Sequence, residues 1–264
     1  MILDGRAIAK DLYTGLAERR AIIQGEVRLG IIVIGVNPVI ESFVRIKSRE
    51  AEKLNIEVVR IDLAADTTTE VAIEAVRRLS ADVDSLIVQL PMPAQIDTNA
   101  VLAAIPKEKD VDAINPDVSG HFVEAPVALA VVELLKRGAI EISEKRAVVI
   151  GAGRLVGAPS ATLLRKLGAN VSMFTLDEGS IEDLKEADII VCGAGNPGFV
   201  KPEHVKDSVA IIDAGASEQA GVVVGDADPG CAEKAAVFTP VPGGVGPVAV
   251  AMIFRNLFDL IGEK

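Results

Sequence analysis

Short apolar runs alternate with amphipathic stretches along almost the whole 264-residue chain. Two amphipathic stretches in the first half predict helices near 37–54 and 67–79. The apolar runs predict strands: LGIIVIG, IEVVRIDL and SLIVQL in the first half, and RAVVIG, ANVSMFT, ADIIVCG and VAIIDAG in the second. Strands that alternate with helices are typical of βαβ units. The predicted fold class is therefore α/β with mostly parallel sheet.

The strands fall into two series, which predict two α/β lobes with a cleft between them. The stretch APVALAVVELLKRGAI between the series predicts a connecting helix, and we expect the boundary near residue 140. The first domain is then 1–139, and the second, a Rossmann-type doubly wound sheet, is 140–246. A periodic stretch at about 247–264 predicts a terminal helix that packs back onto the first domain.

Composition narrows the class of ligand. Half of the residues are hydrophobic and the net charge is -11, which excludes a disordered chain and argues against non-specific binding to nucleic acid or anionic membranes. We therefore expect a small-molecule ligand. The two cysteines, Cys192 and Cys231, have no metal-type spacing, and nothing resembles a secretory signal or an apolar span of transmembrane length. These features predict a cytoplasmic protein without a metal site.

A glycine-rich loop follows the first strand of the second series. Gly151, Gly153 and Gly157 are spaced G-x-G-x-x-x-G, with a helix expected to start near residue 155. A strand, a glycine loop and a helix in this order predict a dinucleotide site, because backbone amides and the helix dipole face the pyrophosphate. The alternative is a tight turn without a ligand. Arg154 favours NADP and Asp177 favours NAD, so the two cues disagree.

Three features of the first half are candidates for chemistry. Phe43 and Lys47 are four residues apart on one helix and share a face. In a cleft, the ring would stack on a flat substrate and the desolvated lysine would have a lowered pKa. Gln89 ends a predicted strand, where α/β proteins place ligand groups. Asp110 and Asp112 lie in a polar loop. Taken singly, spacing favours simpler explanations over these roles: a core phenylalanine beside a solvated lysine, a chance strand-end glutamine, and turn chemistry for either aspartate.

Longer motifs link these features in a fixed order: ILDGRAIA, SFVRIK, VQLPMP, KDVDAINP, VVIGAGRLVGAP, GNPGF, IIDAG, VVGD and TPVPGGVGP. Together they resemble the bifunctional methylenetetrahydrofolate dehydrogenase/methenyltetrahydrofolate cyclohydrolase family over nearly the whole chain, and the last motif, at 239–247, is the most specific. The resemblance implies oxidation of 5,10-methylenetetrahydrofolate to the methenyl form with NADP, then hydrolysis to 10-formyltetrahydrofolate. It also implies a homodimer and a place in the one-carbon metabolism that serves purine biosynthesis.

The resemblance assigns roles to individual residues. It implies Lys47 as the catalytic lysine, Gln89 as its hydrogen-bond partner and Asp112 as the residue that holds the pterin ring. The implied substrate-binding residues are Phe43, Asp112, Pro242, Gly243 and Gly244. The implied cofactor-binding residues are Gly151, Gly153, Arg154, Val156, Gly157, Thr175 and Gly193. Folate is expected on 1–139 and NADP on 140–246, with NAD as the alternative cofactor.

The chain departs from the family pattern at three places. Phe43 stands where the family has tyrosine, which keeps a stacking surface and removes a hydroxyl. Ala152 and Gly153 replace the arginine and serine of the glycine loop, so Arg154 is the candidate for the extra phosphate of NADP. Residues 124–125 replace a cysteine and a threonine. Two alternatives stay open: a monofunctional dehydrogenase with weak or absent hydrolysis, and a non-catalytic nucleotide-binding module.

Overall fold

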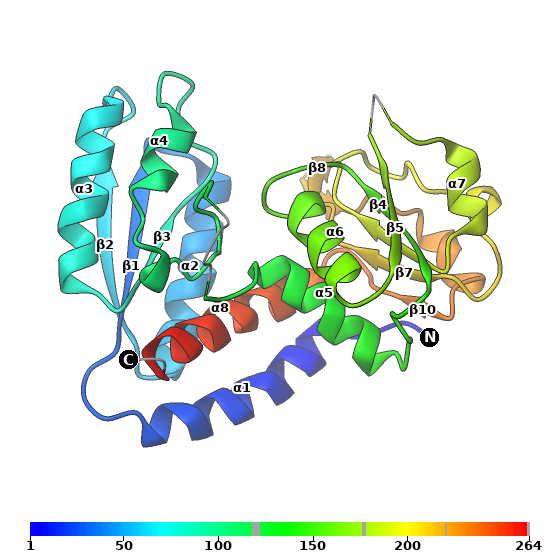
Figure 1. Cartoon of the computed structure of the whole chain (residues 1–264), viewed down its shortest axis with the longest axis horizontal. Coiled ribbons are helices and arrows are strands. Elements are labelled where there is room, and N and C mark those ends of the chain that lie inside the picture. The colour runs from blue at the N-terminus through cyan, green and yellow to red at the C-terminus, as the bar shows by residue number, and fades with distance from the viewer. Residues whose placement is uncertain (118–121, 176–177, 220, 263–264) are drawn as a thin grey trace. The chain divides into compact units, whose positions relative to one another are not determined.

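The chain forms two compact units (Figure 1). The computed structural model describes residues 1–117, 122–175, 178–219 and 221–262. Residues 13–124 and 253–264 form the unit that we name the three-stranded unit, after its sheet. Residues 1–12 and 125–252 form the five-stranded unit. The predicted α/β fold class is confirmed, since parallel strands alternate with helices in both units.

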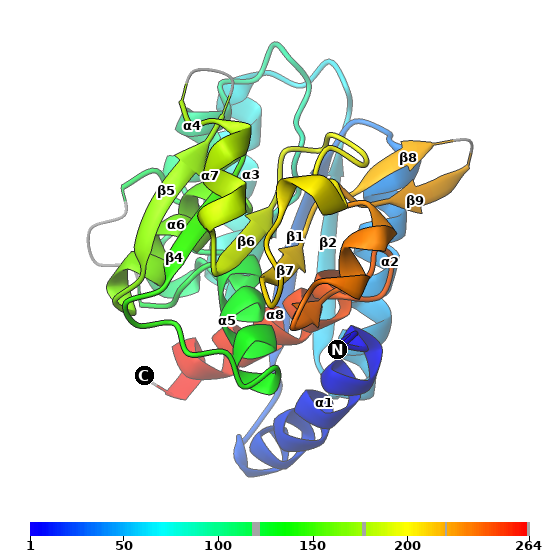
Figure 2. The ribbon, with the colours of Figure 1, turned by 90° about the vertical axis from the view of Figure 1, so that its right-hand side faces the viewer.

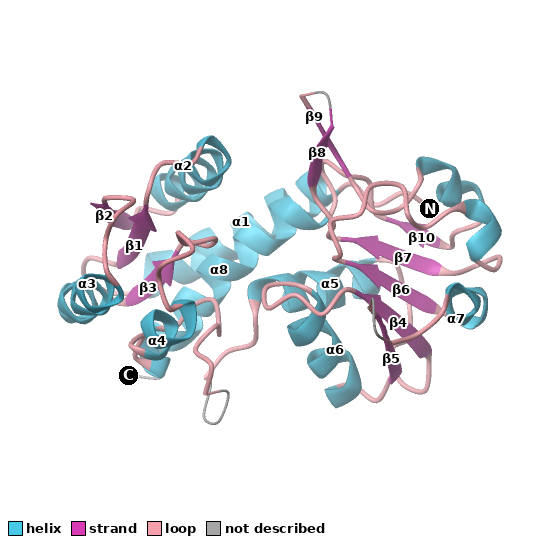
Figure 3. Cartoon of the chain, turned by 90° about the horizontal axis from the view of Figure 1, so that it is seen from above, coloured by secondary structure: helices cyan, strands magenta, loops and turns pink. Residues whose placement is uncertain are grey.

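The sheet of the three-stranded unit is parallel and has the strand order β2-β1-β3 (Figure 3). All three strands lie where the apolar runs predict them, and the helices between them follow the predicted stretches closely. The elements of this unit are β1 (Arg28–Ile34), α2 (Pro38–Lys53), β2 (Glu57–Leu63), α3 (Thr69–Asp82), β3 (Ser85–Val88), α4 (Thr98–Ala103) and the 3-10 helix η1 (Lys107–Lys109).

Alternation along β1 explains how its sheet is covered. Ile32 and Ile34 are buried in one core with α3 and α4, and α2 lies on the opposite side of the sheet in Figure 3. Because successive side chains of a strand point to opposite faces, a strand covered on both faces is apolar throughout. The six residues after Arg28 in β1 are all buried. Packing on both faces therefore fixes the position of the carboxyl end of β1 and of the start of α2.

The five-stranded unit contains a parallel sheet in the order β10-β7-β6-β4-β5, which Figure 3 shows with all five strands and Figure 2 shows from the side for β4 to β7. Its elements are α5 (Pro126–Arg137), β4 (Arg146–Ile150), α6 (Gly157–Lys166), β5 (Asn170–Phe174), α7 (Ile181–Glu186), β6 (Ile189–Cys192), β7 (Ala210–Asp213) and β10 (Val237–Phe238). The smaller elements are the 3-10 helices η2 (Pro202–His204) and η3 (Pro229–Glu233) and the antiparallel hairpin of β8 (Ser217–Gln219) with β9 (Val222–Val224).

The two faces of this sheet bury alternate residues. Ala147 and Val149 of β4 pack with α5 and α6, whereas Val148 and Ile150 pack with Leu184 of α7. Helices on both faces of a parallel sheet define the doubly wound arrangement. The carboxyl ends of β4, β6 and β7 therefore end at one edge, which is where such folds bind ligands.

The unit boundaries differ from the expected division near residue 140. Helix α5 belongs to the five-stranded unit because Val131, Leu134 and Leu135 are buried in the same core as β4, β6 and β7. Residues 1–12 also belong there, since the Leu3 amide donates to the Phe238 carbonyl over 2.9 Å beside β10. The sequence pattern separates the strand series, but it does not show which core a connecting helix joins.

Two long helices each contribute to both units. Helix α1 (Gly5–Ile22) was not predicted, and α8 (Val245–Gly262) corresponds to the predicted terminal helix. Residues up to Met252 of α8 belong to the five-stranded unit, and those from Ile253 belong to the three-stranded unit. By length and composition α8 would also span a membrane, with a mean hydropathy of 1.5, but 61% of it is buried within the protein. Its apolar character is that of a core helix.

Candidate active site

Lys47 and Gln89 meet at the carboxyl end of the three-stranded sheet. Lys47 Nζ donates to Gln89 Oε1 over 2.8 Å. The lysine is held by α2, which Asn37 starts by accepting from the amides of Val39 and Ile40 at 2.9 and 3.3 Å. Two residues that are 42 positions apart in the sequence are thus in contact, because α2 follows β1 and Gln89 follows the adjacent strand β3.

The orientation of Gln89 is fixed from both sides. Its backbone amide donates to the Ile32 carbonyl over 2.9 Å, which continues the β1–β3 pairing one residue beyond Val88. Its side-chain amide nitrogen Nε2 donates to the Leu90 carbonyl over 2.9 Å. The amide oxygen Oε1 is consequently left facing Lys47, and an acceptor at this position holds the amine of Lys47 in one direction.

Asp112 comes to the same end of the sheet along a different path. Asp110 forms a parallel bridge with Leu86 of β3, so the chain beyond Asp110 runs alongside β3 toward Gln89. The side chains of Lys47 and Asp112 are both partly exposed and interact electrostatically. The structure therefore brings together the three residues Lys47, Gln89 and Asp112.

Burial and charge act in opposite directions on Lys47 and Asp112. Burial lowers the pKa of Lys47, and the nearby carboxylate of Asp112 opposes that shift. Burial raises the pKa of Asp112, and the charge of Lys47 opposes that shift. Desolvation is the larger cause for both groups. An amine with a lowered pKa has a larger neutral fraction near pH 7, and only the neutral form accepts a proton.

Phe43 lies one helical turn before Lys47 on α2. Its side chain is 49% exposed, so the ring is not a core residue, and the simple alternative that the spacing left open does not hold. Side chains four residues apart on a helix share a face. An exposed ring beside a partly buried amine offers a flat ligand a stacking surface and a hydrogen-bonding group on the same face.

Asp110 organises the loop that carries Asp112. Its oxygen Oδ2 accepts from the amides of Ile114 and Asn115 at 2.8 and 2.7 Å, while Oδ1 is buried without a hydrogen-bond partner among the described residues. Burial is the main cause that raises the pKa of Asp110 to about 7. Spacing alone did not separate the two aspartates, and only the family resemblance assigned the ligand role to Asp112. In the structure Asp110 is a buried loop support, and Asp112 interacts electrostatically with Lys47.

The glycine loop after β4 is tightly packed at two of its three glycines. A Cβ atom on Gly157 would lie 1.9 Å from the Gly151 carbonyl oxygen, and one on Gly151, whose φ is +90°, would lie 2.7 Å from the Gly193 carbonyl oxygen. At Gly153 the nearest atom would be 4.0 Å away. Gly151 and Gly157 are therefore required by the fold itself, whereas Gly153 has space for a side chain.

Helix α6 begins at Gly157, two residues later than expected, because 154–156 form a turn. Val156 stands at the N-cap and has no side-chain acceptor, so a side-chain cap is missing from this helix. A Cβ on Gly193 would clash with Val156 Cγ1 at 2.4 Å, which shows how closely the loop after β6 approaches. The uncapped helix start, the glycine cradle and the sheet edge together fit an anionic dinucleotide.

The remaining predicted cofactor residues surround this loop. Arg154 is exposed on the turn before α6. Thr175 follows β5, and its amide donates to the Glu178 carbonyl over 2.8 Å. The Gly151 amide donates to the Phe174 carbonyl over 2.8 Å, which ties the glycine loop to the end of β5. Asp177 lies outside the described residues. The structure thus places Arg154 and Thr175 on neighbouring elements of one sheet edge.

The loop 240–244 belongs to the same unit as the glycine loop. Gly243 has a φ of +106°, and a Cβ on Gly244 would lie 2.6 Å from the Pro240 carbonyl oxygen. A Cβ on Gly5, at the start of α1, would lie 1.8 Å from the Gly244 carbonyl oxygen. Pro242 is exposed. The motifs ILDGRAIA and TPVPGGVGP, at opposite ends of the sequence, are therefore packed against each other.

Two functional candidates were missed by sequence reasoning. The motifs IIDAG and VVGD contain Asp213 and Asp226, whose side chains are 2% and 0% exposed. Asp226 Oδ2 accepts from the amides of Ala194 and Gly195 at 2.8 and 3.1 Å. These amides belong to the loop after β6 that contacts the glycine loop through Gly193. Both motifs are part of the family resemblance, and each aspartate follows an apolar run, but nothing in their spacing singled them out.

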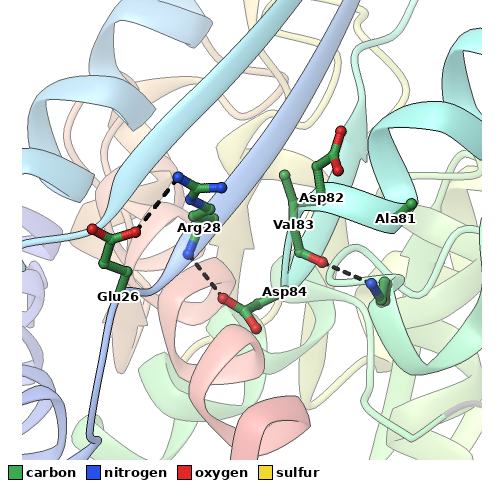
Figure 4. A pocket seen from close by; sticks show the side chains of 7 residues that line it. Glu26, Arg28, Ala81, Asp82, Val83 and Asp84 are labelled. Carbon is green, nitrogen blue, oxygen red and sulfur yellow. Dashed lines mark hydrogen bonds and ion pairs between the residues drawn. The ribbon is translucent and has the colours of Figure 1, made fainter.

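A shallow pocket occupies the opposite, amino-terminal end of β1 and β3 (Figure 4). Arg28 forms an ion pair with Glu26 at 3.5 Å, and its amide donates to Asp84 over 2.9 Å. Lys109 donates to the carbonyls of Ser80 and Val83. These polar groups hold neighbouring segments of the chain together, and the pocket lies at the end of the sheet away from Lys47 and Gln89.

Comparisons with known proteins agree over the whole chain. The family model for the catalytic domain of tetrahydrofolate dehydrogenase/cyclohydrolase matches residues 3–112, and that for its NAD(P)-binding domain matches residues 125–264. The bifunctional protein FolD of Lactobacillus delbrueckii subsp. bulgaricus is 38% identical over 272 residues, with 98% of this chain and 96% of the relative covered.

Two solved structures have the same fold over their whole length. The bifunctional FolD methylenetetrahydrofolate dehydrogenase/cyclohydrolase of Campylobacter jejuni superimposes with a TM-score of 0.95 at 30% identity, covering 100% of this chain and 99% of the other. The enzyme of Trypanosoma brucei, solved with NADP cofactor and inhibitor, has a TM-score of 0.92 at 32% identity, covering 100% and 97%. The predicted resemblance is confirmed.

Proposed function

The chain belongs to the tetrahydrofolate dehydrogenase/cyclohydrolase family, and from this premise we propose that it oxidises 5,10-methylenetetrahydrofolate to the methenyl form and hydrolyses that product to 10-formyltetrahydrofolate. The observation that carries the proposal is the hydrogen bond from Lys47 Nζ to Gln89 Oε1 at 2.8 Å. An amine with a lowered pKa, held in one direction beside a carboxylate, is the group that the hydrolytic step requires.

Lys47 acts in the hydrolysis as a proton acceptor. Water attacks the cationic methenyl carbon, and the neutral amine of Lys47 takes a proton from the attacking oxygen. The bond from this carbon to the ring nitrogen N5 then breaks, the hydroxyl proton moves to N5, and the carbon remains on N10 as a formyl group. Gln89 holds the amine in position, and burial keeps part of it neutral near pH 7.

Substrate binding uses the side chains beside Lys47. Asp112 accepts hydrogen bonds from the donor-rich edge of the pterin, which a carboxylate matches well. Phe43 stacks on the flat ring with its exposed face. Asp110 supports this arrangement through the amides of Ile114 and Asn115. The family resemblance adds Pro242, Gly243 and Gly244 of the five-stranded unit to the substrate-binding residues, and the two glycines, which lack side chains, permit close approach of a ligand.

NADP accepts the hydride that leaves the methylene carbon. The pyrophosphate fits the uncapped start of α6 and the cradle of Gly151 and Gly157, whose glycines leave no room for a Cβ. Arg154, exposed on the turn before α6, is the cation that we assign to the extra phosphate of NADP. Gly153, Val156, Thr175 and Gly193 complete the cofactor-binding set. NAD, which has no 2′-phosphate, is the alternative hydride acceptor if Arg154 does not bind that phosphate.

A second candidate function follows from Phe43. A phenylalanine on the exposed face beside Lys47 supplies a stacking surface but no hydroxyl to assist the lysine. The hydrolytic step depends on proton transfer at Lys47, whereas hydride departure does not. A monofunctional dehydrogenase that releases methenyltetrahydrofolate is therefore the alternative within the same family.

The experiment that tests the proposal follows both steps in one sample. Purified chain, 5,10-methylenetetrahydrofolate and NADP are mixed, and NADPH, the methenyl form and the formyl product are measured over time. Equal amounts of NADPH and formyl product support the bifunctional enzyme. NADPH with accumulating methenyl product supports the monofunctional dehydrogenase. The absence of NADPH and of NADH, when NAD is supplied instead, contradicts both.

Assembly and location are part of the proposal. A homodimer is inferred from the family resemblance, and light scattering of the purified chain tests it. The two free cysteines, Cys192 and Cys231, are buried, which supports a reducing, cytoplasmic environment. The net charge of -11 supports small-molecule partners over nucleic acid and membranes.

A further inference from the structure

Asp213 and Asp226 form a buried pair of carboxyl groups in the five-stranded unit. Asp213 ends β7, and Asp226 lies two residues after β9. The charge of Asp226 is one cause that raises the pKa of Asp213, after burial. The motifs IIDAG and VVGD that contain these residues have no place in the reaction described above, although both are part of the family resemblance.

Each carboxyl group is packed against a glycine beside the other. A Cβ on Gly215, two residues after Asp213, would lie 2.3 Å from Asp226 Cγ. A Cβ on Gly225, directly before Asp226, would lie 2.1 Å from Asp213 Oδ2. The carboxyl group of each aspartate therefore contacts the backbone of a glycine beside the other aspartate, and neither Gly215 nor Gly225 tolerates a side chain.

The hydrogen bonds of the pair reach three loops. Asp213 Oδ1 accepts from the Gly215 amide and Oδ2 from the Ala227 amide, both over 2.9 Å. Asp226 Oδ2 accepts from the amides of Ala194 and Gly195 in the loop after β6. The Asp213 amide donates to Thr239 Oγ1 over 2.7 Å, which adds the segment before the loop 240–244.

The four carboxyl oxygens are not equivalent. Three of them accept from backbone amides, and Asp226 Oδ1 is buried with no partner among the described residues. Among the described residues, Asp226 therefore holds the loop after β6 through Oδ2 alone.

From this geometry we propose that Asp213 and Asp226 are the positioning pair of the dinucleotide site. The pair fixes the loop after β6 against the glycine loop, through Gly193 and Val156. It does not touch the reacting atoms. This inference rests on the proposed function insofar as the ligand of the loop is a nicotinamide dinucleotide.

The pKa of Asp213 follows from its surroundings. Burial, with the charge of Asp226, raises the pKa of Asp213 to about 6, against the amides of Ala227 and Gly215 that lower it. Among the described residues, the thiols of Cys192 and Cys231 also interact electrostatically with Asp213, and burial raises the pKa of both thiols. These thiols are therefore neutral at pH 7 and add no charge beside Asp213.

Asparagine substitutions separate the two residues. Asp226→Asn keeps one oxygen as the acceptor for the amides of Ala194 and Gly195. Its NH₂ group takes the place of Oδ1, toward which no amide of the described residues donates. Asp213→Asn necessarily turns an NH₂ group toward the amide of Gly215 or Ala227, donor against donor. We expect Asp226→Asn to bind NADP within twofold of the native chain. We expect Asp213→Asn to bind it about 10- to 100-fold more weakly.

The experiment measures NADP affinity by calorimetry from pH 5 to pH 8, with KM for the folate substrate and amide hydrogen exchange of residues 193–195 in the free protein. The proposal predicts an unchanged folate KM in both variants and faster exchange in Asp213→Asn. It also predicts a flatter pH dependence of affinity in Asp213→Asn, which lacks the carboxyl group with the raised pKa. Should Asp213→Asn fail to fold, Asp226→Ala replaces it, with the same predicted loss of affinity.

Two results overturn this inference. One is equal loss of NADP affinity in Asp226→Asn and Asp213→Asn, and the other is native affinity and native exchange in both. A native chain that binds neither NADP nor NAD contradicts the proposed function instead. In that case the hydrogen-exchange comparison still tests whether the pair fixes the loop.

Discussion

Lys47 Nζ lies 2.8 Å from Gln89 Oε1, although the two residues belong to different elements and are 42 positions apart in the sequence. The contact exists because β1 and β3 are adjacent parallel strands, with Lys47 on the helix after β1 and Gln89 directly after β3. The carboxyl edge of one sheet thereby pairs an amine of lowered pKa with a fixed acceptor. The proposed hydrolysis depends on this relationship.

Asp112→Asn is expected to move the pH dependence of hydrolysis. The charge of Asp112 raises the pKa of Lys47 against the larger effect of burial, so its removal lowers that pKa further. Because the neutral amine is the active form, the loss of activity on acidification will occur at lower pH than in the native chain. The measurement is the hydrolysis rate from pH 5 to pH 9 with methenyltetrahydrofolate as substrate.

The control for this pH profile is Asp66→Asn, an exposed loop residue. It removes the same charge from the three-stranded unit without facing Lys47. A profile for Asp112→Asn that coincides with the profiles of the control and of the native chain would show that Asp112 does not set the protonation of Lys47.

Phe43→Tyr is expected to raise the hydrolysis rate about tenfold, with a smaller effect on hydride transfer. The exposed ring keeps its stacking surface, and the new hydroxyl lies on the helix face of Lys47, where it can exchange a hydrogen bond with the amine. The two rates are measured separately, with methenyl- and methylenetetrahydrofolate as substrates. An increase of the same size in both rates would point to better substrate binding rather than to proton transfer.

Arg154→Ala is expected to weaken NADP about 10- to 100-fold and to leave NAD affinity within twofold. The reason is that a charge-assisted hydrogen bond to the 2′-phosphate is lost, and NAD has no such phosphate. The measurement is kcat/KM with each dinucleotide, for the native chain and the variant. Equal losses with NADP and NAD would assign Arg154 to the pyrophosphate or to the fold.

Gly157→Ala and Gly153→Ala form a matched pair in the glycine loop. A Cβ on Gly157 meets the Gly151 carbonyl oxygen at 1.9 Å, so backbone must move, and we expect a loss of about 3 kcal/mol or more in the free energy of unfolding. A Cβ on Gly153 meets nothing closer than 4.0 Å, and we expect a change below about 0.5 kcal/mol. Urea denaturation of both variants, with the native chain, compares them directly; similar losses would mean that the loop is packed differently.

The strands and the principal helices could be predicted from the sequence because their signals are local. Seven apolar runs marked β1 to β7, and the amphipathic stretch near 37–54 marked α2. Elements without a long periodic stretch were missed, among them the two-residue β10 and the hairpin of β8 with β9. Helix α1 was missed as well, and its two ends belong to different compact units.

The candidate site divides in the same way. Lys47 and Phe43 share a helix face, which spacing predicts, and Gln89 and Asp112 were expected at strand ends or loops. Asp226 could not be found by spacing, because the amides it binds, at Ala194 and Gly195, are about 30 positions earlier in a loop without periodicity. Which of two nearby aspartates supports a loop and which faces a ligand depends on burial, which only the folded chain defines.

The proposed role of Lys47 is tested most directly by Lys47→Met, with Lys136→Met, an exposed lysine of α5, as the control. We expect Lys47→Met to lower the hydrolysis of methenyltetrahydrofolate about 100-fold or more, with NADP affinity unchanged, because a proton acceptor is lost while the five-stranded unit is untouched. The control keeps native rates. If Lys47→Met hydrolysed methenyltetrahydrofolate at the native rate, with the native dependence on folate concentration, the assignment of Lys47 as the catalytic lysine would be contradicted.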